Sequence, residues 1–70
     1  MTQNQRIIKY IRQYGSITQA EAANDLGCYR LGARIWELKR DGYKIKTDTV
    51  TYKNSEGNRV TFARYSLKEL

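Results

Sequence analysis

The sequence contains no histidine and no proline, and its only cysteine is Cys28. A lone cysteine excludes an internal disulfide bond, and without histidine it lacks its usual partner in a structural zinc site. The seven Asp and Glu residues are scattered among polar residues, with no glycine-rich phosphate loop and no nucleophile beside a base. We therefore expect a protein that is not an enzyme and that holds no metal or other cofactor.

Long apolar runs are also missing. No segment approaches the roughly 20 apolar residues that cross a bilayer, and the polar start MTQNQ does not resemble a signal peptide. We expect a cytoplasmic, reduced protein with no membrane partner. Seventy residues predict a single small domain over residues 1–70, and 40% hydrophobic residues with six tyrosines are too many for a disordered tail.

Positive charge, in contrast, is abundant. Thirteen Lys and Arg residues against seven Asp and Glu give a formal net charge of +6. This balance favours a polyanion such as nucleic acid as the partner. Because many small basic proteins bind nothing acidic, the charge indicates a function only together with the arrangement of the basic residues.

The first half of the chain has helical periodicity. Capping boxes that begin at Thr2 and Thr18 predict helices over residues 3–14 and 19–26. Between them, Ile17 can enter the core as a one-residue strand or plug. The sequence therefore predicts two short helices before a corner.

A turn at residues 26–28 joins the second helix to a third, which is predicted from about Tyr29 to Asp41. Gly27 can adopt a positive φ, and Cys28 is small enough to be buried under the corner, a more frequent role than that of a reactive thiol. The buried stripe of the third helix consists of Leu31, Ile35 and Leu38. This outline is typical of a helix-turn-helix, which presents one helix to the DNA major groove.

After Gly42 the pattern becomes alternating, and the runs 43–53 and 58–67 predict a β-hairpin. A three-residue loop, Ser55 to Gly57, with Gly57 left-handed sets the register. That register pairs Tyr52 with Val60, Val50 with Phe62, Thr47 with Tyr65 and Ile45 with Leu67. The base and the tip of the hairpin then bury opposite faces, which predicts a strong twist or a bulge near Asp48.

This order of elements resembles the winged helix-turn-helix domains, and among them the small regulators of prophages and other mobile elements. The resemblance is carried by TQAEAANDLGCYRLGARIWELKRDGYKI and by the final ARYSL. It implies an α+β fold with three helices, a short first strand and a C-terminal two-stranded hairpin as the wing. It also implies a recognition helix whose tail, R-I-x-x-L-[KR]-x-x-G-Y-x-I, is formed here by Arg34, Ile35, Leu38, Lys39, Gly42, Tyr43 and Ile45.

The candidate base contacts lie near the start of the third helix: Tyr29, Arg30, Ala33 and Arg34. Arg30 and Arg34 are the first candidates, because arginine matches the O6 and N7 atoms of guanine. The alternative is that these arginines only solvate the helix or pair with Asp25 or Glu37. For Trp36, on the outward half of the helix, packing against the hairpin base or Tyr43 is expected in preference to contact with nucleic acid.

Further candidate DNA contacts lie at the hairpin tip and at the start of the second helix. Lys53, Asn54 and Arg59 suit contact with phosphates or the minor groove, although charges on a strand also prevent aggregation. Thr18 and Gln19 can offer N–H groups and side chains to a phosphate, although Thr18 also suits a purely capping role.

Two functions therefore remain open. The leading hypothesis is a sequence-selective protein that binds double-stranded DNA, as a small transcriptional regulator of phage or mobile-element type. The alternative is a protein-binding winged helix that inhibits or redirects a host complex, supported by an apolar patch at the hairpin tip. The patch consists of Val50, Tyr52, Val60 and Phe62. A homodimer would cover the same patch and would also suit DNA binding at paired half-sites.

Overall fold

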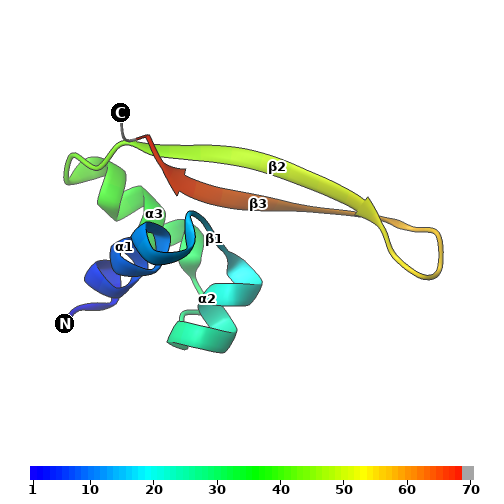
Figure 1. Ribbon diagram of the computed structural model, residues 1–70, viewed down its shortest axis with the longest axis horizontal. Coiled ribbons are helices and arrows are strands. Elements are labelled where there is room, and N and C mark those ends of the chain that lie inside the picture. The colour runs from blue at the N-terminus through cyan, green and yellow to red at the C-terminus, as the bar shows by residue number, and fades with distance from the viewer. Residues whose placement is uncertain (69–70) are drawn as a thin grey trace.

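The computed structural model describes residues 1–68 of the chain. In this part, three helices pack together and a long two-stranded hairpin projects to one side of them (Figure 1). The elements are α1 (Gln3–Tyr14), β1 (Ile17–Thr18), α2 (Gln19–Leu26), α3 (Leu31–Arg40), β2 (Ile45–Lys53) and β3 (Arg59–Leu67). The strands form one antiparallel sheet in the order β1-β3-β2, so the predicted α+β architecture is confirmed. No helix in the described residues is both long and apolar enough to cross a membrane.

The first two helices begin and end where their caps predict. Both capping boxes are present: the Thr2 hydroxyl accepts the N–H of Gln5, and the Thr18 hydroxyl accepts the N–H of Glu21. Gly15 and Gly27 end α1 and α2 in the left-handed conformation. These bounds equal the predicted ones because the signals are local and lie within one turn of each helix end.

The third helix begins later than predicted. Its first helical residue is Leu31, so Tyr29 and Arg30 belong to the turn. After the left-handed Gly27, the chain first buries Cys28 beneath the corner, and only then does it take up helical backbone angles. The prediction that Cys28 is a buried turn residue is confirmed, and the predicted helix start at Tyr29 is wrong.

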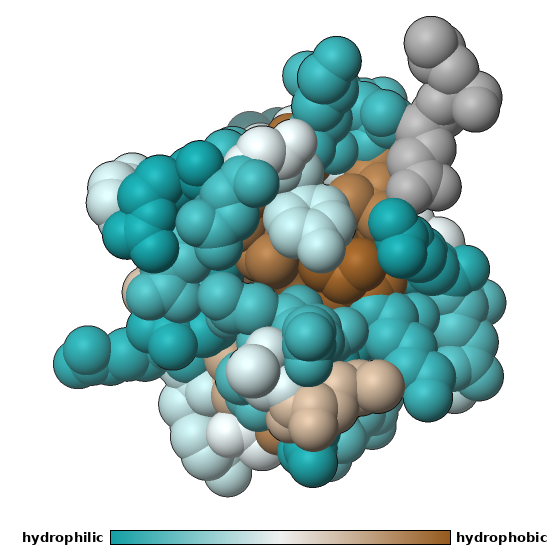
Figure 2. Space-filling model, turned by 90° about the vertical axis from the view of Figure 1, so that its left-hand side faces the viewer, coloured by the Kyte–Doolittle hydropathy of each residue, from teal (hydrophilic) through white to brown (hydrophobic). Residues whose placement is uncertain are grey.

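One apolar core lies between the helices and the base of the sheet. All three residues of the predicted stripe on α3 are buried in it, and so is Ile17 from β1. The buried residues are Ile7, Ile8, Ile11, Ile17, Ala22, Cys28, Leu31, Ile35, Leu38 and Ile45. On the face drawn in Figure 2, hydrophilic residues surround a strongly apolar area near the centre, and a smaller, less apolar group lies below it.

The hairpin has the predicted register from end to end. Its pairs run without interruption from Ile45–Leu67 to Lys53–Arg59, and Asp48 pairs regularly with Arg64. No bulge therefore occurs near Asp48, and the change of buried face is made by the twist and gentle curve visible in Figure 1. The loop is the predicted one, with Gly57 at φ +82°.

Candidate nucleic-acid interface

The side chain of Gln19 joins the start of α2 to the start of α3. Its Nε2 donates to the carbonyl oxygen of Cys28 at 2.8 Å, and its Oε1 accepts from the N–H of Leu31 at 2.9 Å. Arg30, the residue at the N-cap position of α3, makes no capping hydrogen bond of its own. Gln19 therefore supplies a cap from twelve residues away and fixes α3 relative to α2.

Thr18 likewise acts within the protein. Its hydroxyl accepts the N–H of Glu21 at 3.3 Å, and the Glu21 carboxylate accepts the N–H of Thr18 at 2.9 Å. The capping role considered for Thr18 is therefore the one seen in the structure. The positioning role of Gln19 was missed, and its only sequence signal is the lack of a capping residue before α3.

Three of the predicted contact residues are exposed at the beginning of α3: Tyr29, Arg30 and Ala33. Tyr29 is 79% exposed and projects from the turn, and Arg30 follows it directly. Gly32, beside Ala33, is also exposed. The start of α3 thus combines a cation and an aromatic ring with two small residues, whose short side chains leave the helix backbone accessible.

Arg34 lies on a different side of α3. Its side chain is only 37% exposed, and its Nε lies 3.3 Å from Oε1 of Glu37 in an ion pair without hydrogen-bond geometry. The Nδ2 of Asn4, in α1, donates to the same Glu37 oxygen at 3.3 Å. Of the two roles considered for Arg34, the structure therefore contains the pairing with Glu37, on the flank that faces α1.

Trp36 is exposed, so the prediction that it packs against the hairpin base or Tyr43 is wrong. Its side chain remains 63% exposed, and the guanidinium carbon of Arg40 lies 5.2 Å from the ring centroid. At about 100° per residue, Trp36 lies roughly 140° around α3 from Leu31, and so well away from the middle of the buried stripe. The base of the hairpin is instead packed against the core by Ile45, Tyr65 and Leu67.

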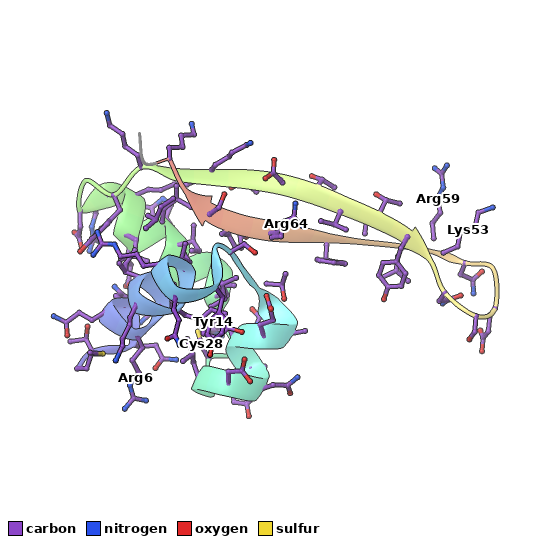
Figure 3. All side chains as sticks on the ribbon, viewed as in Figure 1. Arg6, Tyr14, Cys28, Lys53, Arg59 and Arg64 are labelled. Carbon is purple, nitrogen blue, oxygen red and sulfur yellow. The ribbon has the colours of Figure 1, made fainter. Side chains whose placement is uncertain are left out.

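The tip of the hairpin carries a pair of like charges. Lys53 lies directly opposite Arg59, and Figure 3 shows both side chains on the side of the hairpin that faces away from the helices. Like charges in directly opposite positions destabilise a strand pair unless an anion lies between them. Asn54 shapes the loop beside them, since its Oδ1 accepts the N–H groups of Glu56 and Asn58, both at 3.0 Å.

The other face of the hairpin brings the four predicted apolar residues together. Val50 pairs with Phe62 and Tyr52 with Val60, and the rings of Tyr52 and Phe62 meet edge to face at 6.0 Å. Only Tyr52 is exposed, at 50%, because the four side chains cover one another. A groove of about 680 Å³ separates this face from the start of α2.

The ionisable groups offer little chemistry beyond charge. In residues 1–68 no group of three or more Cys, Asp or Glu side chains could hold a metal ion. The Tyr10 hydroxyl donates to Asp25 at 2.7 Å, and this hydrogen bond raises the pKa of Tyr10 above its ordinary value. That contact joins α1 to α2 and lies apart from the exposed side of α3.

The whole chain was also compared with known proteins. It matches the winged helix-turn-helix domain family over residues 2–70. No curated protein matches it, and no solved structure does. The three helices, the β1-β3-β2 sheet and the hairpin as wing agree with that match. The chain therefore belongs to the winged helix-turn-helix domain family, a family that suggests DNA binding.

Proposed function

We propose that the protein is a sequence-selective regulator that binds double-stranded DNA, with α3 in the major groove and the hairpin as a wing on the DNA backbone. The observation that carries this proposal is the division of α3 into two sides. Leu31, Ile35 and Leu38 anchor its inner side, whereas Lys39 and Arg40 lie at its exposed positions and Arg30 is exposed in the turn just before it. The acid of the helix, Glu37, is drawn toward Arg34 and Asn4 instead.

Arg30 is the best placed side chain for reading a base. It is exposed at the end of α3 that leads into the groove, and a guanidinium can bond O6 and N7 of one guanine. Tyr29 and Ala33 flank it. Arg34 would have to leave Glu37 to reach DNA, so we assign it to holding the helix and, at most, to a phosphate. We assign Thr18 and Gln19 to holding α2 and α3 in position.

The wing contributes through Lys53 and Arg59, with Asn54 shaping the loop that presents them. A phosphate between the two cations would relieve their mutual repulsion. The acid at the tip, Glu56, lies in the loop and not in the strand positions of the two cations. The net charge of +6 supports the same partner. The resemblance of residues 18–45 to prophage regulators supports a regulator of phage or mobile-element type, with residues 1–70 acting as one domain.

Fluorescence anisotropy with labelled duplexes at several salt concentrations tests the proposal. About five neutralised phosphates give a slope of log K against log salt of about −4 to −5. Replacing Lys53 and Arg59 together by alanine should make the slope shallower by about 2 and weaken all sequences alike. A matched control is Lys9→Ala with Arg12→Ala on α1, which removes the same charge and should change the slope by less. Salt-independent binding of wild type would contradict the proposal.

The second candidate is a protein-binding wing, favoured by the groove between the wing and the start of α2. One observation argues against a large protein interface on this wing: of the four apolar residues, only Tyr52 is exposed. Sedimentation of the free protein distinguishes a monomer from a homodimer. Unbiased selection of bound DNA sequences then distinguishes the two functions, since an enriched motif supports the regulator and a lack of enrichment favours the protein-binding module.

A further inference from the structure

We infer that Trp36 reads a thymine, by placing its indole ring against the 5-methyl group of that base in the major groove. This inference rests on the proposed function, because it requires α3 to enter the groove. The inference goes beyond the proposed function by naming a specificity-determining residue and the base that this residue recognises.

The first step is the exposure of Trp36. Tryptophan is the largest apolar side chain and is highly buried on average, yet here it is 63% exposed and is not among the described residues packed on the core. Its exposure follows from its place on α3, one residue after the buried Ile35. The fold therefore makes little use of this ring, which leaves it available to a partner.

The second step is the shape of the surface around the ring. Ala33 lies one turn before Trp36 on the same side of α3, and Gly32 is its neighbour. An added Cβ at Gly32 would meet no atom within 4 Å, so the packing of the protein does not demand a glycine there. Because the two residues before it on this side are small, neither shields the ring of Trp36 from the floor of a groove.

The third step is the chemistry of the ring. The guanidinium of Arg40 lies over it at 5.2 Å from the centroid, a cation–π contact, and the Nε of the same group lies 3.7 Å from the Asp41 carboxylate. A phosphate can take the place of that exposed carboxylate beside the guanidinium, whereas a cationic or neutral apolar partner cannot. Apart from its Nε1–H group, the ring is apolar, and its exposed face gains most from contact with an apolar surface.

The major groove offers one apolar group on its base edges, the 5-methyl group of thymine. The other edge groups are hydrogen-bond donors and acceptors, which lose water without compensation when an indole ring covers them. Trp36 therefore fits a position occupied by thymine. The competing placement, with the ring against sugar and phosphate, would not distinguish one base from another.

The test uses the duplex enriched by selection, with each thymine replaced in turn by deoxyuridine, which lacks only the methyl group. Kd is measured by anisotropy at one salt concentration for wild type and for Trp36→Ala. We expect one replacement to weaken wild type about fourfold, the effect of burying one methyl-sized group, and to leave Trp36→Ala unchanged.

Tyr14→Ala is the matched control, because Tyr14 is an aromatic residue on α1 that is also 63% exposed. It should keep the full sensitivity to deoxyuridine. A Trp36→Phe variant, which retains an aromatic ring, should keep part of it. Equal melting temperatures for Trp36→Ala and wild type exclude a folding defect.

The outcomes separate the two proposals. If wild type binds the selected duplex and no deoxyuridine replacement distinguishes it from Trp36→Ala, thymine reading by Trp36 is wrong and the DNA-binding function stands. The same holds if the selected duplex contains no thymine. If no duplex binds even at low salt, the proposed function itself fails.

Discussion

Replacing Gln19 by alanine removes two hydrogen bonds at the corner between α2 and α3. The amide bonds the carbonyl of Cys28 at 2.8 Å and the N–H of Leu31 at 2.9 Å, so both of its polar groups are lost at once. The N-cap residue itself, Arg30, makes no capping hydrogen bond that would replace them. The variant should therefore loosen the position of α3 as well as lower stability.

The magnitude follows from the two bonds. Each contributes about 0.5–1.5 kcal/mol net, and water can reach this exposed side chain, so together they contribute about 1–2 kcal/mol. In a domain of this size that corresponds to a fall in Tm of about 4–16 °C. A 70-residue domain has a free energy of unfolding of about 4–10 kcal/mol, so the variant remains folded at room temperature.

Circular dichroism gives the Tm, and urea denaturation gives the free energy of unfolding. Gln13→Ala is the control, because the Gln13 amide lies 3.4 Å from the hydroxyl of the adjacent Tyr14 and is exposed, so its loss should stay within about 0.5 kcal/mol. If Gln19 instead acts by touching DNA, Gln19→Ala will weaken DNA binding at an unchanged Tm. That result would refute the positioning role.

Two further predictions concern stability alone. Gly32→Ala should raise the free energy of unfolding by about 0.5–1 kcal/mol, because glycine is a poor helix former and the new Cβ meets nothing within 4 Å. Urea denaturation measures this change, and a free energy of unfolding below that of wild type would show a steric clash. Tyr10→Phe removes the hydrogen bond to Asp25, which raises the pKa of Tyr10 above its ordinary value near 10. Because the folded state binds the hydroxyl proton of Tyr10 more tightly than the unfolded state does, the hydrogen bond stabilises the protein fully below about pH 10. Its contribution to stability declines at higher pH. The difference in stability between wild type and Tyr10→Phe should therefore shrink as the pH rises above about 10, and a constant difference would argue against this linkage.

Local signals in the sequence predicted most of the backbone. The capping boxes of α1 and α2 and the loop with Gly57 each act within a few residues. The bounds of these helices and the register of the hairpin can therefore be predicted without knowledge of the rest of the fold. The start of α3 could not be found in this way. It depends on a hydrogen bond from Gln19, twelve residues earlier, which exists only once the corner has formed.

Side-chain surroundings were harder to predict for the same reason. Periodicity places Trp36 on the outward half of α3, but whether a neighbour covers it depends on how the other elements pack, and in the fold it remains 63% exposed. For Arg34 the sequence allowed both solvation and a pair with Glu37. Asn4, from α1, joins that site and helps to hold the Glu37 carboxylate, a contact between residues 33 positions apart.

The exposed side of α3 departs from what stability alone would favour. Gly32 weakens the helix without serving the packing, and Trp36 leaves a large apolar ring in water. Both departures lie on the exposed side of α3, near Arg30 and Arg40, whereas the buried side of the same helix consists of the apolar residues Leu31, Ile35 and Leu38. Local departures from the best folding choice are expected where function requires them. Their shared position therefore supports the same proposal as the charge does, namely that this side of α3 is the surface that meets DNA.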